Sequence, residues 1–319
     1  MSLPSHIAAR LSVPAIASPL FIISQPDLVI ATCRAGMIGA FPSLNARPSG
    51  IFEQWLQRLD AELTDHDAPY AVNLIAHRTN TRLDEDLALC VQYKVPVVIT
   101  SLGALEHVNQ AIHSYGGIVL HDVINDQFAR KAIAKGADGI IAVAAGAGGH
   151  AGTTSPFALI QEIREWFDGP LALSGAIATG GAIAAAQAMG ADLGYIGSPF
   201  IATEEAVADQ RYKEMITQAN SQDIVYSSLF TGVHGNYLRQ SIVNSGLDPD
   251  NLPSADPSTM DFASAKNVKA WRDIWGSGQG IGAIHNIVPA AQRVQQFATE
   301  YQQAVKKLSN NPQLYKTAN

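Results

Sequence analysis

Short apolar runs rich in β-branched residues alternate with stretches of helical periodicity up to about residue 200. Such runs are typical of buried parallel strands, and the longer periodic stretches are typical of amphipathic helices. The predicted strands are Val13–Ser18, Met37–Ala40, Tyr70–Leu74, Val97–Thr100, Gly117–Leu120, Gly139–Val143, Pro170–Ser174 and Leu193–Ile196. The predicted helices are Asp27–Arg34, Ile51–Leu63, Thr81–Tyr93, Leu105–Tyr115, Gln127–Lys135, Pro156–Trp166 and Thr179–Met189.

This alternation predicts an α/β fold in which the eight strands form a (β/α)8 TIM barrel. The competing fold is a doubly wound sheet. The even spacing through eight units disfavours that sheet, as does the absence of a G-x-G-x-x-G fingerprint after the first strand.

The pattern changes after Phe200, where helical pieces surround a polar loop at Leu247–Pro257. We therefore predict a second, smaller and mainly helical domain, residues 206–284, inserted after the eighth strand. The barrel domain then consists of residues 1–205 and 285–319, closed by a helix at Val288–Leu308.

The composition narrows the class of protein. Of the 319 residues, 47% are hydrophobic and 15% are charged, a profile typical of a compact α/β enzyme. The net charge of −7 argues against nucleic acid as the main partner, and no apolar run is long enough to cross a membrane. We expect a soluble, cytoplasmic protein in which Cys33 and Cys90 are buried thiols, and no bound metal, since no residues have metal-ligand spacing.

The segment from Ala144 to Gly152 follows the sixth predicted strand and contains four glycines in nine residues, with His150 near its end. Glycines let the backbone approach a flat or phosphorylated ligand closely because they carry no Cβ. The active sites of TIM barrels lie at the carboxyl ends of their strands. A histidine side chain can accept or donate a proton near neutral pH. The segment predicts a ligand loop that carries a base.

Two further glycine-rich segments, Leu173–Gly181 and Gly194–Phe200, follow the seventh and eighth predicted strands. This is the usual phosphate site of TIM barrels, where loop amides hold the anion. Neither segment contains lysine or arginine, so backbone dipoles would hold the phosphate. The alternative is that these glycines only let helices pack closely on strands.

These motifs together resemble the nitronate monooxygenase family, formerly called 2-nitropropane dioxygenases. The resemblance rests on the glycine loop with His150, on Ser174-Gly175-Ala176-Ile177 and on Gly197–Glu205. Ala17–Phe21 resembles the family's first barrel loop, and Trp275–Gly282 resembles its late glycine-rich segment. Three positions depart from the family pattern: Val143, Ser174 and Ala176. Val143 stands where many relatives have glutamine, and Ser174 and Ala176 stand in a motif that is usually Ala-Gly-Gly-Ile.

The resemblance implies non-covalent FMN at the carboxyl face of the barrel, an alkyl nitronate as substrate and O2 as co-substrate. It implies that His150 is the base toward the substrate carbon. The cofactor contacts that it implies are Pro19, Leu20, Phe21, Asn73, His121, Gly148, Gly149, Gly175, Ala176, Gly180, Gly181, Tyr195, Gly197, Ser198 and Gln279.

Several interpretations stay open at this stage. His150 either acts as a base, for which an imidazole with a pKa near 6.5 is suited, or only makes hydrogen bonds within its loop. His121 either contacts the cofactor or is a structural residue capped by Asp122, and His234 lies either at a substrate entrance or in a surface loop. The leading function is an FMN-dependent nitronate monooxygenase. The alternatives are an NAD(P)H-dependent reductase of quinones or enoyl thioesters with the same fold and flavin, and a flavin-binding protein without turnover.

Overall fold

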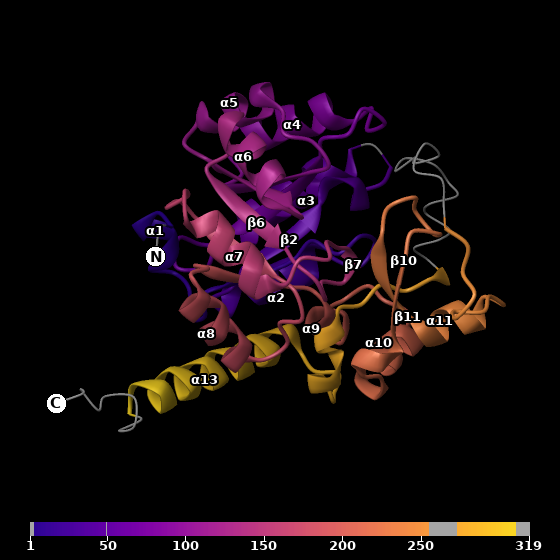
Figure 1. Cartoon of the computed structure of the whole chain (residues 1–319). Coiled ribbons are helices and arrows are strands. Elements are labelled where there is room, and N and C mark those ends of the chain that lie inside the picture. Colours follow the sequence, from indigo (N-terminus) through magenta and orange to yellow (C-terminus); the bar gives the residue numbers. More distant parts are fainter. Residues whose placement is uncertain (1–2, 49, 255–272, 311–319) are drawn as a thin grey trace.

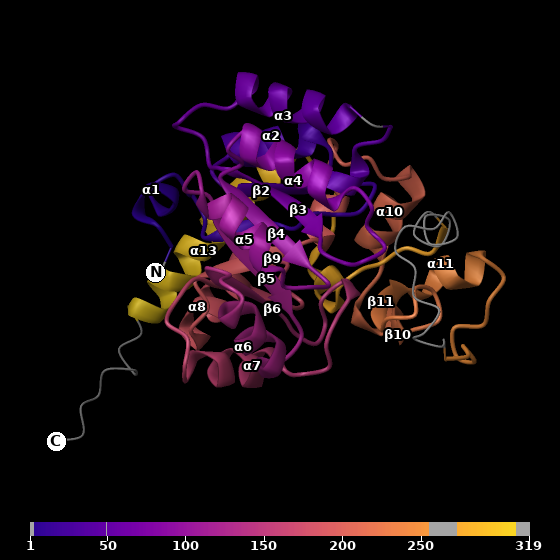
Figure 2. The ribbon, with the colours of Figure 1, turned by 90° about the horizontal axis from the view of Figure 1, so that it is seen from above.

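The computed structural model describes residues 3–48, 50–254 and 273–310. The described residues form a closed barrel of parallel strands in the order β1-β2-β3-β4-β5-β6-β8-β9, and β1 pairs with β9 to close it. Helices cover the outside of the barrel, and α13 runs across one side of it (Figures 1 and 2). The predicted (β/α)8 barrel is therefore confirmed.

The bounds of the elements are as follows. The strands are β1 (Ala15–Ala17), β2 (Ile38–Pro42), β3 (Tyr70–Ile75), β4 (Val97–Ser101), β5 (Ile118–Val123), β6 (Gly139–Val143), β7 (Gly149–His150), β8 (Leu171–Ser174), β9 (Leu193–Ile196), β10 (Ile224–Ser227) and β11 (Gly235–Leu238). The α-helices are α1 (Ser5–Ala8), α2 (Pro26–Arg34), α3 (Ile51–Glu62), α4 (Leu83–Gln92), α5 (Glu106–His113), α6 (Asp126–Ala134), α7 (Pro156–Arg164), α8 (Gly180–Met189), α9 (Ser198–Ile201), α10 (Gln210–Gln218), α11 (Arg239–Asn244) and α13 (Ala290–Ser309). The 3₁₀ turns are η1 (Ser43–Asn45), η2 (Ser221–Asp223) and η4 (Gln279–Ala283).

Alternation along the barrel strands separates an inner from an outer core. Ile99, Leu120 and Ile141 belong to a buried cluster inside the barrel, whereas Val98 and Val119 pack under the surrounding helices. Successive side chains of a strand point to opposite faces, so the inner set continues at the carboxyl ends of the strands as the residues that surround the barrel mouth.

A second sheet lies beside the barrel mouth and was not predicted from the sequence. Strands β10 and β11 form an antiparallel hairpin, and β11 also pairs with β7, which lies within the loop after β6. The segment after β9 is therefore less helical than the sequence pattern indicates. Its polar loop is described as far as residue 254, and the end of that loop, residues 255–257, lies outside the described residues.

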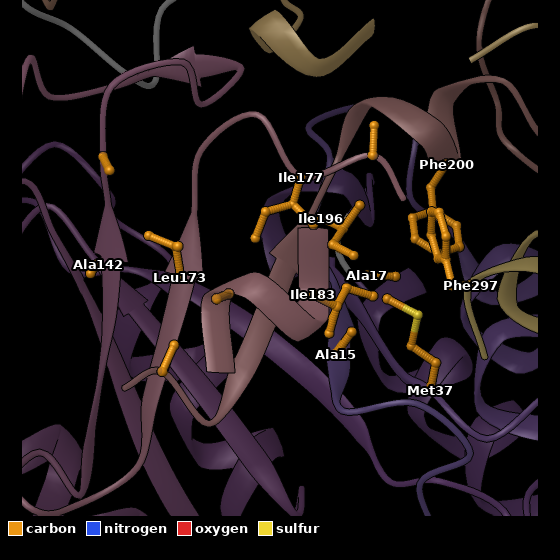
Figure 3. Close-up of a cluster of buried hydrophobic side chains, with 14 of the residues drawn as sticks. Ala15, Ala17, Met37, Ala142, Leu173, Ile177, Ile183, Ile196, Phe200 and Phe297 are labelled. Atoms are coloured by element: carbon orange, nitrogen blue, oxygen red, sulfur yellow. The ribbon is translucent and has the colours of Figure 1, made fainter. Parts of the chain in front are cut away.

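The segment after β9 shares its hydrophobic core with the barrel. Tyr212, Trp275 and Ile281 belong to the same buried cluster as the barrel residues Ala142 and Leu173. Part of this cluster is shown in Figure 3, where the rings of Phe200 and Phe297 meet. These two rings pack edge to face with their centroids 6.0 Å apart, which joins α9 to α13.

Cys33 on α2 and Cys90 on α4 are buried free thiols, as predicted. None of the helices in the described ranges combines the length and apolarity that a membrane span needs. Across the same ranges, no group of three or more His, Cys, Asp and Glu side chains is placed to hold a metal ion.

Candidate functional site

A cavity of about 930 Å³ opens at the carboxyl ends of the barrel strands and extends under the second sheet. Its lining includes the loops after β1, β4, β5, β6, β8 and β9, together with residues of β10 and of the segment before η4. This volume lies at the upper end of the range of ~300–1,000 Å³ for pockets that hold cofactors and small ligands.

Most of the predicted site residues line this one cavity. Those that do are Pro19, Leu20, Phe21, Asn73, His121, Gly148, Gly149, His150, Gly175, Ala176, Tyr195, Gly197 and Ser198. They come from seven strands or strand ends far apart in the sequence, and the barrel brings them together.

Gly180, Gly181 and Gln279 are not part of the lining. The Gly180 amide donates a hydrogen bond of 2.7 Å to the Glu300 carboxylate on α13. A Cβ at Gly180 would lie 2.2 Å from the Phe297 carbonyl oxygen, so this glycine lets α8 pack against α13. At Gly180, therefore, the alternative given in the sequence analysis applies: the glycine permits close packing of a helix. The Gln279 side chain is exposed, while its amide donates to the Gly146 carbonyl at 2.9 Å.

His150 is half-buried on β7, and its backbone is fixed by antiparallel pairing with Gly235 of β11. Its Nε2 lies 2.8 Å from the Oγ1 of Thr231, which belongs to the turn between β10 and β11. Burial lowers the pKa of His150 to about 4, so the imidazole is neutral at pH 7. A neutral imidazole keeps one nitrogen lone pair that can accept a proton.

A chain of polar side chains crosses the barrel mouth from β3 to β5. The Asn73 Nδ2 donates to the Ser101 Oγ at 2.8 Å, and the Ser101 hydroxyl donates to the Asp122 Oδ2 at 2.5 Å. All three residues line the cavity. Burial raises the pKa of Asp122 to about 6, although the hydrogen bond from Ser101 acts in the opposite direction.

His121 does not make the contact with Asp122 that the sequence analysis considered. Its Nδ1 lies 2.7 Å from the Thr100 Oγ1, while the neighbouring Asp122 pairs with Ser101. Asp122 therefore does not cap His121. Burial lowers the pKa of His121 to about 4, so it too is neutral at pH 7.

The glycine loop after β6 packs directly on the segment before η4. A Cβ at Gly148 would lie 2.7 Å from the Gly278 amide nitrogen, so the two backbones meet at a distance that only glycine allows. Gly278 also donates to the Ser198 Oγ at 2.9 Å, which ties the starts of α9 and η4 together. Ala176, in the loop after β8, has a φ of 55°, a left-handed conformation that strains any residue with a Cβ.

Side chains of β10, of the turn before β11 and of α6 also line the cavity. The rings of Tyr226 and His234 stack with centroids 5.1 Å apart, and both residues line the cavity. His234 therefore lies at the cavity and not in a surface loop remote from it. Phe128, which is 46% exposed, and Lys131 lie on α6 at the same cavity.

Three residues of this site were missed in the sequence. Ser101 and Asp122 stand at the carboxyl ends of β4 and β5, so the rule that placed His121 at this end could have found them as well. Thr231 carries no comparable signal, because it lies 81 residues from His150 and meets it only through the second sheet.

The family model described as nitronate monooxygenase matches residues 6–300. The chain belongs to this family.

Relatives of the nitronate monooxygenase family also align with most of the chain. A nitronate monooxygenase from Paraburkholderia phytofirmans is 26% identical and covers 92% of this chain and 94% of its own length. A (3aS,4S,5R,7aS)-5-hydroxy-7a-methyl-1-oxo-octahydro-1H-indene-4-carboxyl-CoA dehydrogenase from Rhodococcus jostii is 24% identical and covers 82% of this chain and 71% of its own length. A nitroalkane oxidase from Streptomyces ansochromogenes has the same fold, with a TM-score of 0.82, 24% identity and coverage of 95% and 100%.

Membership of the nitronate monooxygenase family makes this protein an oxidoreductase that uses a flavin. The cavity fits such a cofactor, because it combines sufficient volume with glycine-rich backbone at the loops after β6, β8 and β9. In the described part of the chain, Lys131 is the one lysine or arginine in the lining, so backbone amides there are the main donors for an anionic group.

Proposed function

We propose that this protein is an FMN-dependent nitronate monooxygenase that oxidises alkyl nitronates with O2 to carbonyl compounds and nitrite. The observation that carries this proposal is the neutral imidazole of His150, held in the cavity wall by the second sheet. Where the substrate is a neutral nitroalkane, His150 first removes the proton next to the nitro group.

The loops after β8 and β9 are the proposed phosphate site. Gly175, Ala176, Gly197 and Ser198 line the cavity there, and their backbone groups would bind the FMN phosphate. FMN supplies the electron-accepting ring that reacts with O2. Asn73 and Tyr195 lie at the barrel mouth, where the ring would rest.

His150 has the properties of a base for a carbon acid. With a pKa of about 4, it is unprotonated over the neutral range, so activity toward a nitroalkane would persist down to acidic pH. We expect kcat/KM for a nitroalkane to fall only as the pH drops toward about 4. A fall centred near the ordinary histidine pKa of about 6.5 would contradict this assignment.

The decisive experiment mixes FMN-loaded protein anaerobically with propyl nitronate, NADH or NADPH and follows the flavin absorbance. We expect rapid bleaching by the nitronate alone, and formation of nitrite when O2 is admitted. In His150→Gln, activity toward the parent nitroalkane should fall by about 100-fold or more, which is the usual contribution of a positioned base. His234→Gln is the matched control, because it removes another cavity imidazole.

A second candidate is an NAD(P)H-dependent oxidoreductase of a thioester. It is favoured by the relative named as a CoA-ester dehydrogenase and by a cavity that extends beyond the barrel mouth to Tyr226. Rapid bleaching by a pyridine nucleotide, without bleaching by propyl nitronate, would favour this function, and reoxidation of the flavin by an enoyl thioester would establish it.

A further inference from the structure

Asp122 is a carboxyl group at the barrel mouth that the proposed reaction does not use. It lines the cavity from the end of β5, next to Ser101 of β4. Leu120, two residues earlier, fills the barrel interior, so alternation along β5 places Asp122 on the inward face, above that core.

The hydrogen bonds of this carboxyl fix where a proton can reside. Its Oδ2 accepts the Ser101 hydroxyl at 2.5 Å, and Ser101 accepts in turn from Asn73. Both hydrogen bonds of this chain are therefore donated in the direction of Oδ2. When the carboxyl is neutral, its proton is on the other oxygen, Oδ1.

The charged groups around Asp122 do little to favour its ionised form. The Tyr195 phenol, from β9, interacts with Asp122 across the barrel mouth, and its pKa is raised by burial and, to a smaller extent, by the Asp122 charge. His121, the adjacent residue, is hydrogen-bonded to Thr100 and is neutral. The other aspartate in the cavity lining, Asp209, contrasts with this, because hydrogen bonds from Arg211 lower its pKa to about 2.

We propose that Asp122 is a flavin-binding residue that donates a hydrogen bond from its neutral carboxyl, through Oδ1, to an acceptor atom of the flavin ring. The substrate must lie against His150, on the side of the second sheet, which leaves the barrel mouth to the ring. A flavin ring offers carbonyl oxygens and ring nitrogens as acceptors. This inference rests on the proposed flavin site and adds a binding residue to it.

Two consequences follow from a preference of the flavin for neutral Asp122. FMN should bind more weakly once Asp122 ionises, because the ionised carboxylate has no proton to donate. By linkage, FMN should also raise the pKa of Asp122, and a tenfold preference corresponds to a rise of about one pH unit.

The first measurement is the dissociation constant of FMN from the flavin-depleted protein between about pH 5 and about pH 8, by quenching of FMN fluorescence. We expect affinity to fall about tenfold across this range in the wild type, the loss typical of one buried hydrogen bond. Asp122→Asn keeps an acceptor for Ser101 and an N–H donor in place of the Oδ1 proton, so it should lack this fall and show only the pH dependence that the FMN phosphate contributes, with its second pKa of about 6. Asp209→Asn, the matched control, should keep the wild-type pH dependence.

The second measurement needs no variant. Carboxyl ¹³C NMR of the wild type, with the Asp122 signal assigned by its absence in Asp122→Asn or by sequential connectivity, gives the pKa of Asp122 with and without FMN. We expect this pKa to be near 6 without FMN and higher in the complex. An unchanged or lower pKa in the complex, or a fall in affinity that is as large in Asp122→Asn as in the wild type, overturns the inference. Failure of FMN to bind at any pH overturns the proposed cofactor instead, so the two failures are distinguishable.

Discussion

The Oγ1 of Thr231 lies 2.8 Å from the Nε2 of His150 and 3.1 Å from the carbonyl oxygen of Val233. The threonine hydroxyl has one hydrogen, which it donates to the Val233 carbonyl. With that hydrogen directed to Val233, we predict that the Thr231 oxygen accepts from His150, so that Nε2 carries the imidazole proton and Nδ1 carries the lone pair. Thr231 thus acts as a positioning residue that selects the tautomer of the proposed base.

Replacement of Thr231 tests this relationship. Thr231→Val removes the acceptor and should lower kcat/KM for a nitroalkane by up to about 100-fold, because the base is no longer held in one orientation. Thr231→Ser keeps the hydroxyl and should retain most of the activity. ¹⁵N NMR of the imidazole should show the Nε2–H tautomer in the wild type and in Thr231→Ser, and a mixture in Thr231→Val. If the wild type has its proton on Nδ1, the assignment is wrong.

His121 should make stability depend on pH. Its pKa is lowered to about 4 in the folded protein, whereas the unfolded value is about 6.5, so the unfolded state binds more protons between these values. The contribution of His121 to the free energy of unfolding should therefore rise with pH from about 4 to about 6.5, by about 3 kcal/mol at most. Denaturant titrations at several pH values give the free energy of unfolding as a function of pH. Its slope against pH should be smaller in His121→Gln than in the wild type. An equal slope would contradict the burial of a neutral imidazole.

The adjacent glycines of α8 should respond differently to alanine. At Gly180 a Cβ would meet the α13 backbone at 2.2 Å and 2.3 Å, so Gly180→Ala should destabilise the protein by about 2 kcal/mol or more. At Gly181 the nearest atom to a Cβ is 3.8 Å away, so Gly181→Ala should be neutral or stabilising by up to about 1 kcal/mol. Chemical unfolding compares the two variants. If Gly180→Ala keeps its stability but loses FMN affinity, Gly180 contacts the phosphate after all.

Ala176 should be improved by glycine. Its φ of 55° strains an L-residue by about 1–2 kcal/mol, and glycine removes this strain. Part of the gain is offset because glycine loses more conformational entropy on folding. Ala176→Gly should therefore raise the free energy of unfolding by about 1 kcal/mol or less. Ala178→Gly, in the same loop but without a positive φ, should lower it. A loss of stability in Ala176→Gly would show that the methyl group makes a contact that outweighs the strain.

The sequence predicted the barrel because each barrel strand and its helix carry their own periodicity. It predicted much of the cavity because parallel strands bring their carboxyl ends to one edge, as at Asn73 and Tyr195. The second sheet was missed because β7 is only two residues long and pairs with a strand more than eighty positions away. Gly180 was placed at the phosphate because the sequence does not show that α13 folds back onto α8.

The two-residue strand β7 connects two parts of the site that lie far apart in the sequence, the barrel loops and the hairpin of β10 and β11. In the proposed site the barrel loops would supply the surface for the flavin, whereas the hairpin of β10 and β11 holds the backbone of His150. Strand β11 also pairs with Gly149, and Asn236 donates to the Ala147 carbonyl, so the strands of the hairpin hold the glycine loop as well. Thr231, in the turn between these strands, contacts His150 without taking part in this pairing. Under the proposed function, libraries confined to the turn residues 228–234 would change the surroundings of His150 and leave the paired strands intact.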